Sequence, residues 1–142
     1  MANILVVDDE CLIPPLLRDC LERYGHTVKL AHSAIGAMGW FDLEDFDLAI
    51  IDVKMPGPLN GLDLVGTIRC DPRAAGTRIL VISGMPDMER SARAAGADSF
   101  LPKPFDLTDI VTFVNELLAI KRQNWTPRPG LSIKDAIRLY SC

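Results

Sequence analysis

The chain has 142 residues, of which 49% are hydrophobic, and a formal net charge of −4 at pH 7. This length suits one domain with a short extension, and the acidic balance argues against a nucleic-acid surface, which is normally basic. No apolar run approaches the roughly 20 residues that a membrane helix needs, so we expect neither a direct nucleic-acid partner nor a membrane partner.

The N-terminus and the cysteines point to the cytoplasm. A strand-like run begins almost at once after Met1, which leaves no room for a signal peptide. The four cysteines have neither the paired spacing of a metal site nor the density of a disulfide scaffold; they are Cys11, Cys20, Cys70 and Cys142. We therefore expect free thiols in a reducing, cytoplasmic environment.

Short aliphatic runs alternate with helix-length stretches along the chain. Several of the runs are apolar at consecutive positions, which is typical of strands in a parallel sheet that is covered on both faces. The expected strands are residues 4–7, 27–30, 48–51, 79–82 and 99–101. Five strand–helix units in series predict a doubly wound α/β fold.

Helical spacing of apolar residues fills the gaps between these strands. The marking residues are Leu12, Leu16, Leu17, Cys20 and Leu21 for the first helix, Ile35, Met38 and Phe41 for the second, Leu62, Val65 and Ile68 for the third, and Leu107, Ile110, Val111, Val114 and Leu118 for the fifth. A fourth, alanine-rich helix is expected over residues 88–95 and should end at Gly96. Ser33 and Asp106 are expected N-caps. Pro14 and Pro15 fall near the first turn of the first helix, where N–H groups are free in any case.

Functional side chains follow four of the five expected strands. Asp8 and Asp9 follow the first, Asp52 ends the third, Ser83 ends the fourth, and the fifth runs into Lys103. In an open parallel sheet these strand ends share one edge, where ligands bind. Clustered carboxylates repel one another unless a cation is present, and Mg²⁺ with oxygen ligands suits such a site. The lysine and the serine can hold phosphoryl oxygens, so the set indicates phosphoryl transfer to a carboxylate.

Four motifs carry a family resemblance: "VVDDE", "LAIIDVKMPG", "VISG" and "FLPKPF", in this order. With them the chain resembles a receiver domain of the response regulators of two-component signalling, the CheY-like superfamily. The resemblance covers residues 2–121 and implies a flavodoxin-like, five-stranded parallel sheet of order 2-1-3-4-5. Residues 122–142 would then form a linker and a short tail.

The resemblance also assigns roles to individual residues. It implies that Asp52 accepts the phosphoryl group, that Lys103 pairs with it, and that Ser83 is a switch hydroxyl that moves onto it. Mg²⁺ would be held by a set of four ligands: Asp8, Asp9, Asp52 and the backbone carbonyl of Lys54. Glu10 is interpreted as first-turn helix charge rather than as a ligand.

Further details of the family pattern fall near the end of the sheet. Phe100 occupies the switch-aromatic position, without the hydroxyl of the tyrosine often found there. The Lys103–Pro104 bond corresponds to the family's cis peptide, which would aim the lysine at the site. The loop "MPGPLNG" is one residue longer than its commonest version. The first helix normally forms part of the kinase-docking face, so Pro14 and Pro15 bear on partner choice.

By this resemblance the chain is a signalling protein rather than a general enzyme. We expect it to take phosphate from a sensor histidine kinase or a phosphotransfer protein and to act on a downstream protein target as a stand-alone regulator. A homodimer through the fourth helix, fifth strand and fifth helix is a further expected partner arrangement. The alternatives are an N-terminal receiver within a larger regulator or hybrid kinase, and an aspartate-nucleophile phosphatase. The phosphatase would normally show a second aspartate two positions after Asp52, where this chain has Lys54.

Two expectations concern the lifetime of the modified state and the tail. Met85 is apolar and cannot orient a water molecule, which predicts a long-lived phosphorylated form. Residues 132–140 have the pattern of a short amphipathic helix, with a capping-box spacing from Ser132 to Asp135. Such a short helix needs a surface to bury its apolar face, so we expect the tail to dock and to take part in signalling.

Overall fold

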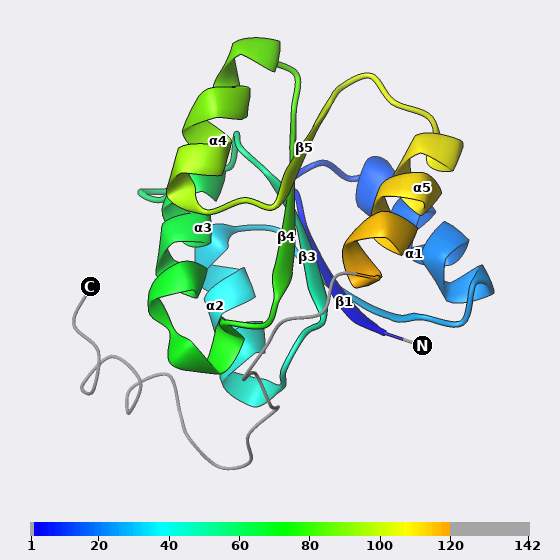
Figure 1. The fold of residues 1–142 in the computed structure, drawn as a ribbon, viewed down its shortest axis with the longest axis horizontal. Helices are drawn as coiled ribbons and strands as arrows, with labels where there is room; N and C mark the ends of the chain where they lie inside the picture. The colour runs from blue at the N-terminus through cyan, green and yellow to red at the C-terminus, as the bar shows by residue number, and fades with distance from the viewer. Residues whose placement is uncertain (1, 120–142) are drawn as a thin grey trace.

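The computed structural model describes residues 2–119, which form an all-parallel, five-stranded sheet with helices on both faces (Figure 1). The strands are β1 (Asn3–Val7), β2 (Thr27–Ala31), β3 (Leu48–Asp52), β4 (Arg78–Ser83) and β5 (Ser99–Pro102). The helices are α1 (Ile13–Arg23), α2 (Ala34–Leu43), α3 (Gly61–Cys70), α4 (Glu89–Ala95) and α5 (Leu107–Leu118), with short 3-10 turns at Pro72–Ala74 and Pro86–Met88.

The strand order is β2-β1-β3-β4-β5, which confirms the doubly wound α/β prediction. Helices α2, α3 and α4 cover one face of the sheet, and α1 and α5 cover the other (Figure 1). The predicted tail and its helix over residues 132–140 lie outside the described residues. Within residues 2–119, no helix combines the length and the apolar character needed to cross a membrane.

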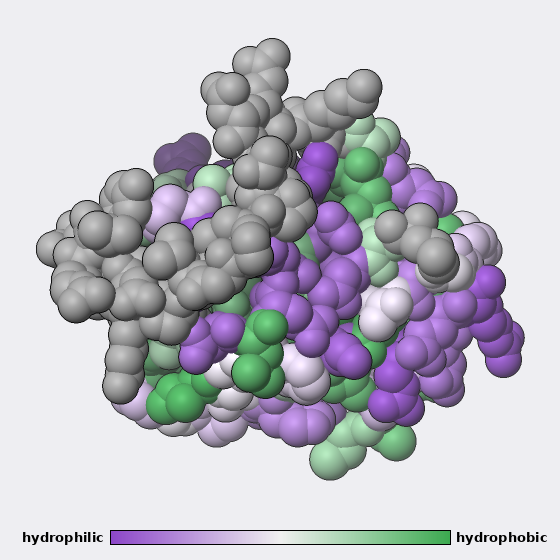
Figure 2. Space-filling view, turned by 90° about the horizontal axis from the view of Figure 1, so that it is seen from below, coloured by the Kyte–Doolittle hydropathy of each residue, from purple (hydrophilic) through white to green (hydrophobic). Residues whose placement is uncertain are grey.

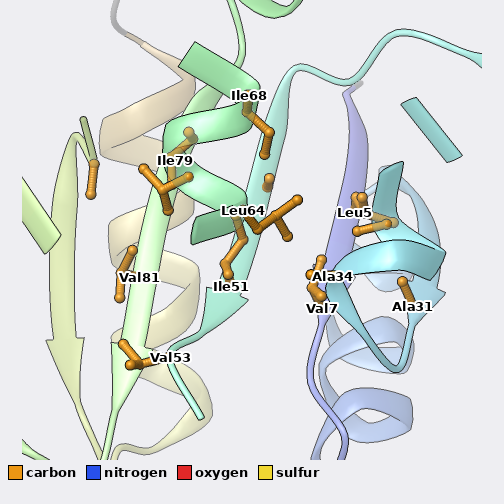
Figure 3. Close-up of a cluster of buried hydrophobic side chains, with 14 of the residues drawn as sticks. Leu5, Val7, Ala31, Ala34, Ile51, Val53, Leu64, Ile68, Ile79 and Val81 are labelled. Atoms are coloured by element: carbon orange, nitrogen blue, oxygen red, sulfur yellow. The ribbon is translucent and has the colours of Figure 1, made fainter. Parts of the chain in front are cut away.

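The core is divided by the sheet into two apolar layers. All residues of β3 and β4 are buried, as expected for strands that helices cover on both faces. On the side of α2, α3 and α4, side chains from β1, β3 and β4 pack against those of the helices; Figure 3 labels Leu5, Val7, Ile51, Ile79 and Val81 among the strand residues. The two layers hold the strands rigidly, so the ends of the strands have fixed positions.

The helix ends follow the predicted capping. The side chain of Ser33 accepts a hydrogen bond from the Gly36 N–H at 3.0 Å. Asp106 and Asp109 form a reciprocal capping box at the start of α5, with N···O distances of 2.9 and 3.1 Å. Gly96 ends α4 with φ of 121°, a conformation that favours glycine. These caps confirm the predicted boundaries of three helices.

Helix α1 tolerates its prolines because Pro14 and Pro15 lie in the first turn. The predicted apolar stripe of this helix is correct only in part. Leu17 and Leu21 are buried, whereas Leu12 and Leu16 are 77% and 52% exposed. The prediction was wrong for these two because Leu12 precedes the helix and Leu16 falls beside the stripe that faces the sheet.

Candidate functional site

The pairing of the strands brings the predicted functional residues to one edge of the sheet. In the β1–β3 ladder Val7 lies opposite Ile51, so the residues that follow them, Asp8 and Asp52, are neighbours. The β3–β4 and β4–β5 ladders continue this register across the sheet and end at Ser83, beside Pro102. Lys103 comes next in the chain, and its N–H donates to the carbonyl oxygen of Ser83 at 2.8 Å.

The ammonium of Lys103 lies at the centre of this edge. Its Nζ is 3.0 Å from Oδ2 of Asp52, 3.1 Å from Oε1 of Glu10 and 3.4 Å from Oδ2 of Asp8. An ammonium has three N–H donors, so all of them have a carboxylate within reach. Three carboxylates therefore share one positive charge. The site has an excess of negative charge when all three are ionised.

Burial makes this excess of charge costly. Asp8 is completely buried and Asp52 is 6% exposed. Burial raises the pKa of Asp8, and the charge of Asp52 raises it further, against the lowering effect of the Glu10 N–H and of Lys103. Burial alone would lower the pKa of Lys103, but its hydrogen bonds to Asp52 and Glu10 outweigh this and hold the pKa above its ordinary value.

The residues present fit a hard divalent cation. Carboxylate oxygens of Asp8, Glu10 and Asp52 all lie within 4.8 Å of one another. Oxygen ligands of this kind, two of them buried, are what Mg²⁺ prefers in proteins. A cation would also offset the repulsion that raises the pKa of Asp8.

The carboxylate cluster contains Glu10 where the predicted ligand set has Asp9, whose role as a ligand stays a prediction. Asp9 is exposed and does not belong to the group found within the described residues, whereas Glu10, which we had interpreted as helix charge, does. The Glu10 N–H donates to Oδ1 of Asp8 at 3.0 Å, and this turn after β1 allows its side chain to reach Lys103. Glu10 makes this contact from outside any helix, since α1 starts three residues later.

Ser83 and Phe100 occupy the positions expected of them on β4 and β5. Ser83 is 1% exposed, and its Oγ accepts a hydrogen bond from the Met85 N–H at 3.0 Å. This contact holds the hydroxyl oxygen at the end of β4, the strand that pairs with the Asp52 strand β3. Phe100 is buried in the apolar layer that includes α3 and α4 residues. The Lys103–Pro104 bond is cis. The switch roles of these side chains remain predictions, as does the role of the Lys54 carbonyl.

Gly61 is a residue that the sequence reasoning did not assign to the site. It begins α3, and its N–H donates to the Val53 carbonyl oxygen at 2.7 Å. A Cβ at this position would lie 2.0 Å from the Asp52 carbonyl oxygen, so any side chain would displace the backbone that carries Asp52. The signal was available in the loop "MPGPLNG", whose last glycine closes it against the strand.

Comparison with known proteins gives one consistent family. A family model described as "Response regulator receiver domain" matches residues 4–115. The DNA-binding transcriptional regulator NtrC of Azospirillum brasilense is 39% identical over 119 residues, which cover 82% of this chain and 24% of that protein. The chain spans about a quarter of the length of the NtrC proteins that it matches.

Solved structures show the same fold. A putative response regulator from Chloroflexus aurantiacus has a TM-score of 0.79 and 29% identity, with 84% of this chain and 98% of that one covered. The response regulator protein TrrA of Thermotoga maritima, solved in complex with Mg²⁺–BeF, has a TM-score of 0.73 and 30% identity over 82% of this chain and 99% of that one.

Proposed function

The chain belongs to the response regulator receiver family, and from this premise we propose that it accepts a phosphoryl group on Asp52. The donor is a sensor histidine kinase or a phosphotransfer protein. The observation that carries the proposal is the ammonium of Lys103, 3.0 Å from the Asp52 carboxylate at the carboxyl edge of the sheet. The lysine can donate to an oxygen of a phosphoryl group attached to that carboxylate.

The transfer requires one bond to form and one to break. An oxygen of Asp52 attacks phosphorus, and the P–N bond of a phosphohistidine donor breaks, with the electron pair and a proton going to the leaving imidazole. Lys103 and the hydroxyl of Ser83 then hold two of the phosphoryl oxygens. Gly61 keeps the backbone of Asp52 in place, because its missing side chain lets α3 start against the strand.

Mg²⁺ is the cofactor that this site suits. The carboxylates of Asp8 and Asp52 would hold it, and the family pattern adds Asp9 and the carbonyl of Lys54. Bound there, the ion would neutralise charge between these carboxylates and the incoming phosphoryl oxygens. The Mg²⁺–BeF complex of the related TrrA protein supports this assignment.

We propose that the phosphorylated domain acts through protein contacts in the cytoplasm, without direct contact to nucleic acid. Two arrangements fit the comparisons. The Chloroflexus neighbour is matched over 98% of its length, as a stand-alone receiver would be, whereas NtrC carries much additional chain. Reading the gene beyond codon 142 distinguishes a stand-alone regulator from the receiver portion of a larger one. A homodimer through α4, β5 and α5 is compatible with either.

The test of the proposal is the mass of the protein after incubation with acetyl phosphate and Mg²⁺. The parent should gain the mass of one phosphoryl group, and Asp52→Asn should gain none. Asp19→Asn is the matched control, since it makes the same change at an exposed carboxylate on α1 and should behave as the parent does.

Two outcomes would contradict the proposal. One is an equal mass gain in Asp52→Asn, which would place the phosphoryl group elsewhere. The other is sustained turnover of a general phosphate ester by the parent, which would identify the chain as an aspartate-nucleophile phosphatase instead.

A further inference from the structure

We infer that Glu10 is an exchangeable counterion of Lys103: it holds the ammonium while Asp52 is unmodified and yields it to the phosphoryl group. The inference rests on the function proposed for this site, and it makes Glu10 a positioning residue that acts through Lys103. It arises from the one carboxylate of the cluster that the family pattern does not assign.

The contacts of Lys103 show why one partner must leave. Its three N–H donors have three carboxylate acceptors, at 3.0 Å on Asp52, 3.1 Å on Glu10 and 3.4 Å on Asp8. A phosphoryl oxygen on Asp52 needs at least one of these donors. Asp52 frees one donor itself, because its carboxylate loses its charge when the acyl phosphate forms. A phosphoryl group carries up to two negative charges, so it also draws a second donor, which Asp8 or Glu10 has to release.

Burial indicates which partner is released. The side chain of Asp8 is 0% exposed, whereas that of Glu10 is 48% exposed. A buried carboxylate that lost the lysine would be left without water to replace it, at considerable cost. The Glu10 carboxylate would regain water. In the part of the chain that the structure describes, Lys103 is also its only hydrogen-bond or ion-pair partner.

The same carboxylate has a second effect of opposite sign. Its oxygen lies within 4.8 Å of oxygens of Asp8 and Asp52, so its charge adds to the attraction for a divalent cation. Glu10 should therefore strengthen the binding of Mg²⁺ alone and weaken the binding of a phosphoryl group once Mg²⁺ is present. A side chain that was only a solvated surface charge would do neither measurably.

The experiment separates the two effects with two probes and the full chain. Mg²⁺ affinity is measured by calorimetry in the parent, in Glu10→Gln and in Glu10→Asp. Beryllofluoride affinity is then measured by ¹⁹F NMR at saturating Mg²⁺. Glu22→Gln is the matched control, since it removes the same charge from an exposed position in the last turn of α1.

Glu10→Gln should bind Mg²⁺ about two- to fivefold more weakly and beryllofluoride about two- to fivefold more tightly than the control, the range typical of partly exposed ion pairs. Glu10→Asp keeps the charge on a shorter arm. It should keep most of the Mg²⁺ affinity and still bind beryllofluoride more tightly.

If Glu10→Gln and Glu10→Asp bind beryllofluoride no more tightly than Glu22→Gln, the inference is wrong while the proposed function stands. If the parent itself fails to bind beryllofluoride with Mg²⁺, the proposed function fails and the role of Glu10 fails with it. Because Glu10 is half exposed, both variants should unfold at the parent's temperature, which a thermal scan checks.

Discussion

The two ends of the sheet use charged side chains in opposite ways. At the amino end, the guanidinium of Arg69 donates to the carbonyl oxygens of Gly96 and Thr77 at 2.8 and 2.7 Å and to Asp98 at 2.7 Å. There one cation meets one carboxylate and two carbonyls. At the carboxyl end, one ammonium serves three carboxylates. The first arrangement stabilises the fold, and the second leaves charge for a ligand to complete.

Two further polar side chains at the amino end are paired within the protein. The Thr77 hydroxyl donates to the Phe46 carbonyl oxygen at 2.8 Å, and Asp47 accepts the Asn3 N–H at 2.8 Å. The molecule seen from below the view of Figure 1 has mostly hydrophilic residues over the middle of its uncovered surface (Figure 2). Within one sheet, paired charges therefore stabilise the fold, and uneven charge in a buried setting indicates a functional site.

The largest effect should come from removing the Arg69–Asp98 ion pair at the amino end of the sheet. Arg69→Ala removes an ion pair whose side chains are 20% and 17% exposed, and it also removes the donor to the Gly96 and Thr77 carbonyls. We expect a loss of about 2–4 kcal/mol in the free energy of unfolding, measured by urea denaturation.

The control for Arg69→Ala is a solvent-exposed ion pair. Glu89 and Arg93 on α4 form an ion pair at 3.0 Å with side chains that are 51% and 49% exposed. Glu89→Ala should cost no more than about 0.5 kcal/mol. Equal losses of unfolding free energy in the two variants would show that the Arg69–Asp98 pair stabilises the fold no more than an exposed ion pair does.

Removing a negative charge from the carboxyl end of the sheet should instead increase the free energy of unfolding. Asp8→Asn removes a buried charge, and its amide oxygen can still accept the Glu10 N–H that Asp8 accepts at 3.0 Å. Without divalent cations, we expect the variant to be about 1 kcal/mol more stable than the parent. A less stable variant would mean that the Asp8–Lys103 contact outweighs the repulsion.

The pH dependence gives the same test without a mutation. Burial raises the pKa of Asp8 in the folded protein, so the protonated carboxyl favours folding. This contribution to the free energy of unfolding is fully present below the ordinary pKa of 3.8 and is lost as the pH rises through the raised value. The advantage of Asp8→Asn should therefore grow with pH above about 4 and shrink when Mg²⁺ is added. Denaturation with a chelator over a pH series measures both.

The smallest effect concerns the lifetime of the modified state. Met85 is 44% exposed, and its N–H donates to the Ser83 hydroxyl, so its backbone lies beside the site. A glutamate there could orient a water molecule toward the phosphoryl group. Met85→Glu should shorten the lifetime about threefold, roughly 0.6 kcal/mol in the barrier.

Loss of phosphate from Met85→Glu is followed by intact mass after removal of the donor. Leu43→Glu places the same charge on an exposed leucine at the far end of α2 and should leave the lifetime unchanged. If Met85→Glu and Leu43→Glu have equal lifetimes, the side chain at position 85 does not affect the loss of phosphate.

The sequence was sufficient for the parts of the site that strand register determines. Asp8, Asp52 and Ser83 are at or directly after strand ends, so counting along buried strands was enough to bring them together. The caps at Ser33 and Asp106 were equally readable, because capping depends on local chemistry alone.

The features that the sequence did not predict depend on where the chain turns after a strand. Asp9 and Glu10 are both acidic, and only the fold of the loop decides which one reaches Lys103. The requirement for glycine at position 61 comes from a contact with Asp52 across the loop that joins β3 to α3. Leu16 carries a residue type typical of a core but lies on an exposed part of α1. Apart from the glycine, which the loop "MPGPLNG" could have indicated, these features depend on tertiary contacts that no local pattern contains.

The central claim is that the unbalanced end of the sheet exists to carry a phosphoryl group on Asp52, and chemical trapping tests it most directly. The parent is incubated with acetyl phosphate and Mg²⁺, reduced with borohydride, which converts an aspartyl phosphate to homoserine, and then sequenced by tandem mass spectrometry. The account predicts homoserine at position 52 and aspartate at positions 8 and 9. Homoserine at another position, or none at all in a folded protein with Mg²⁺ bound, would contradict it.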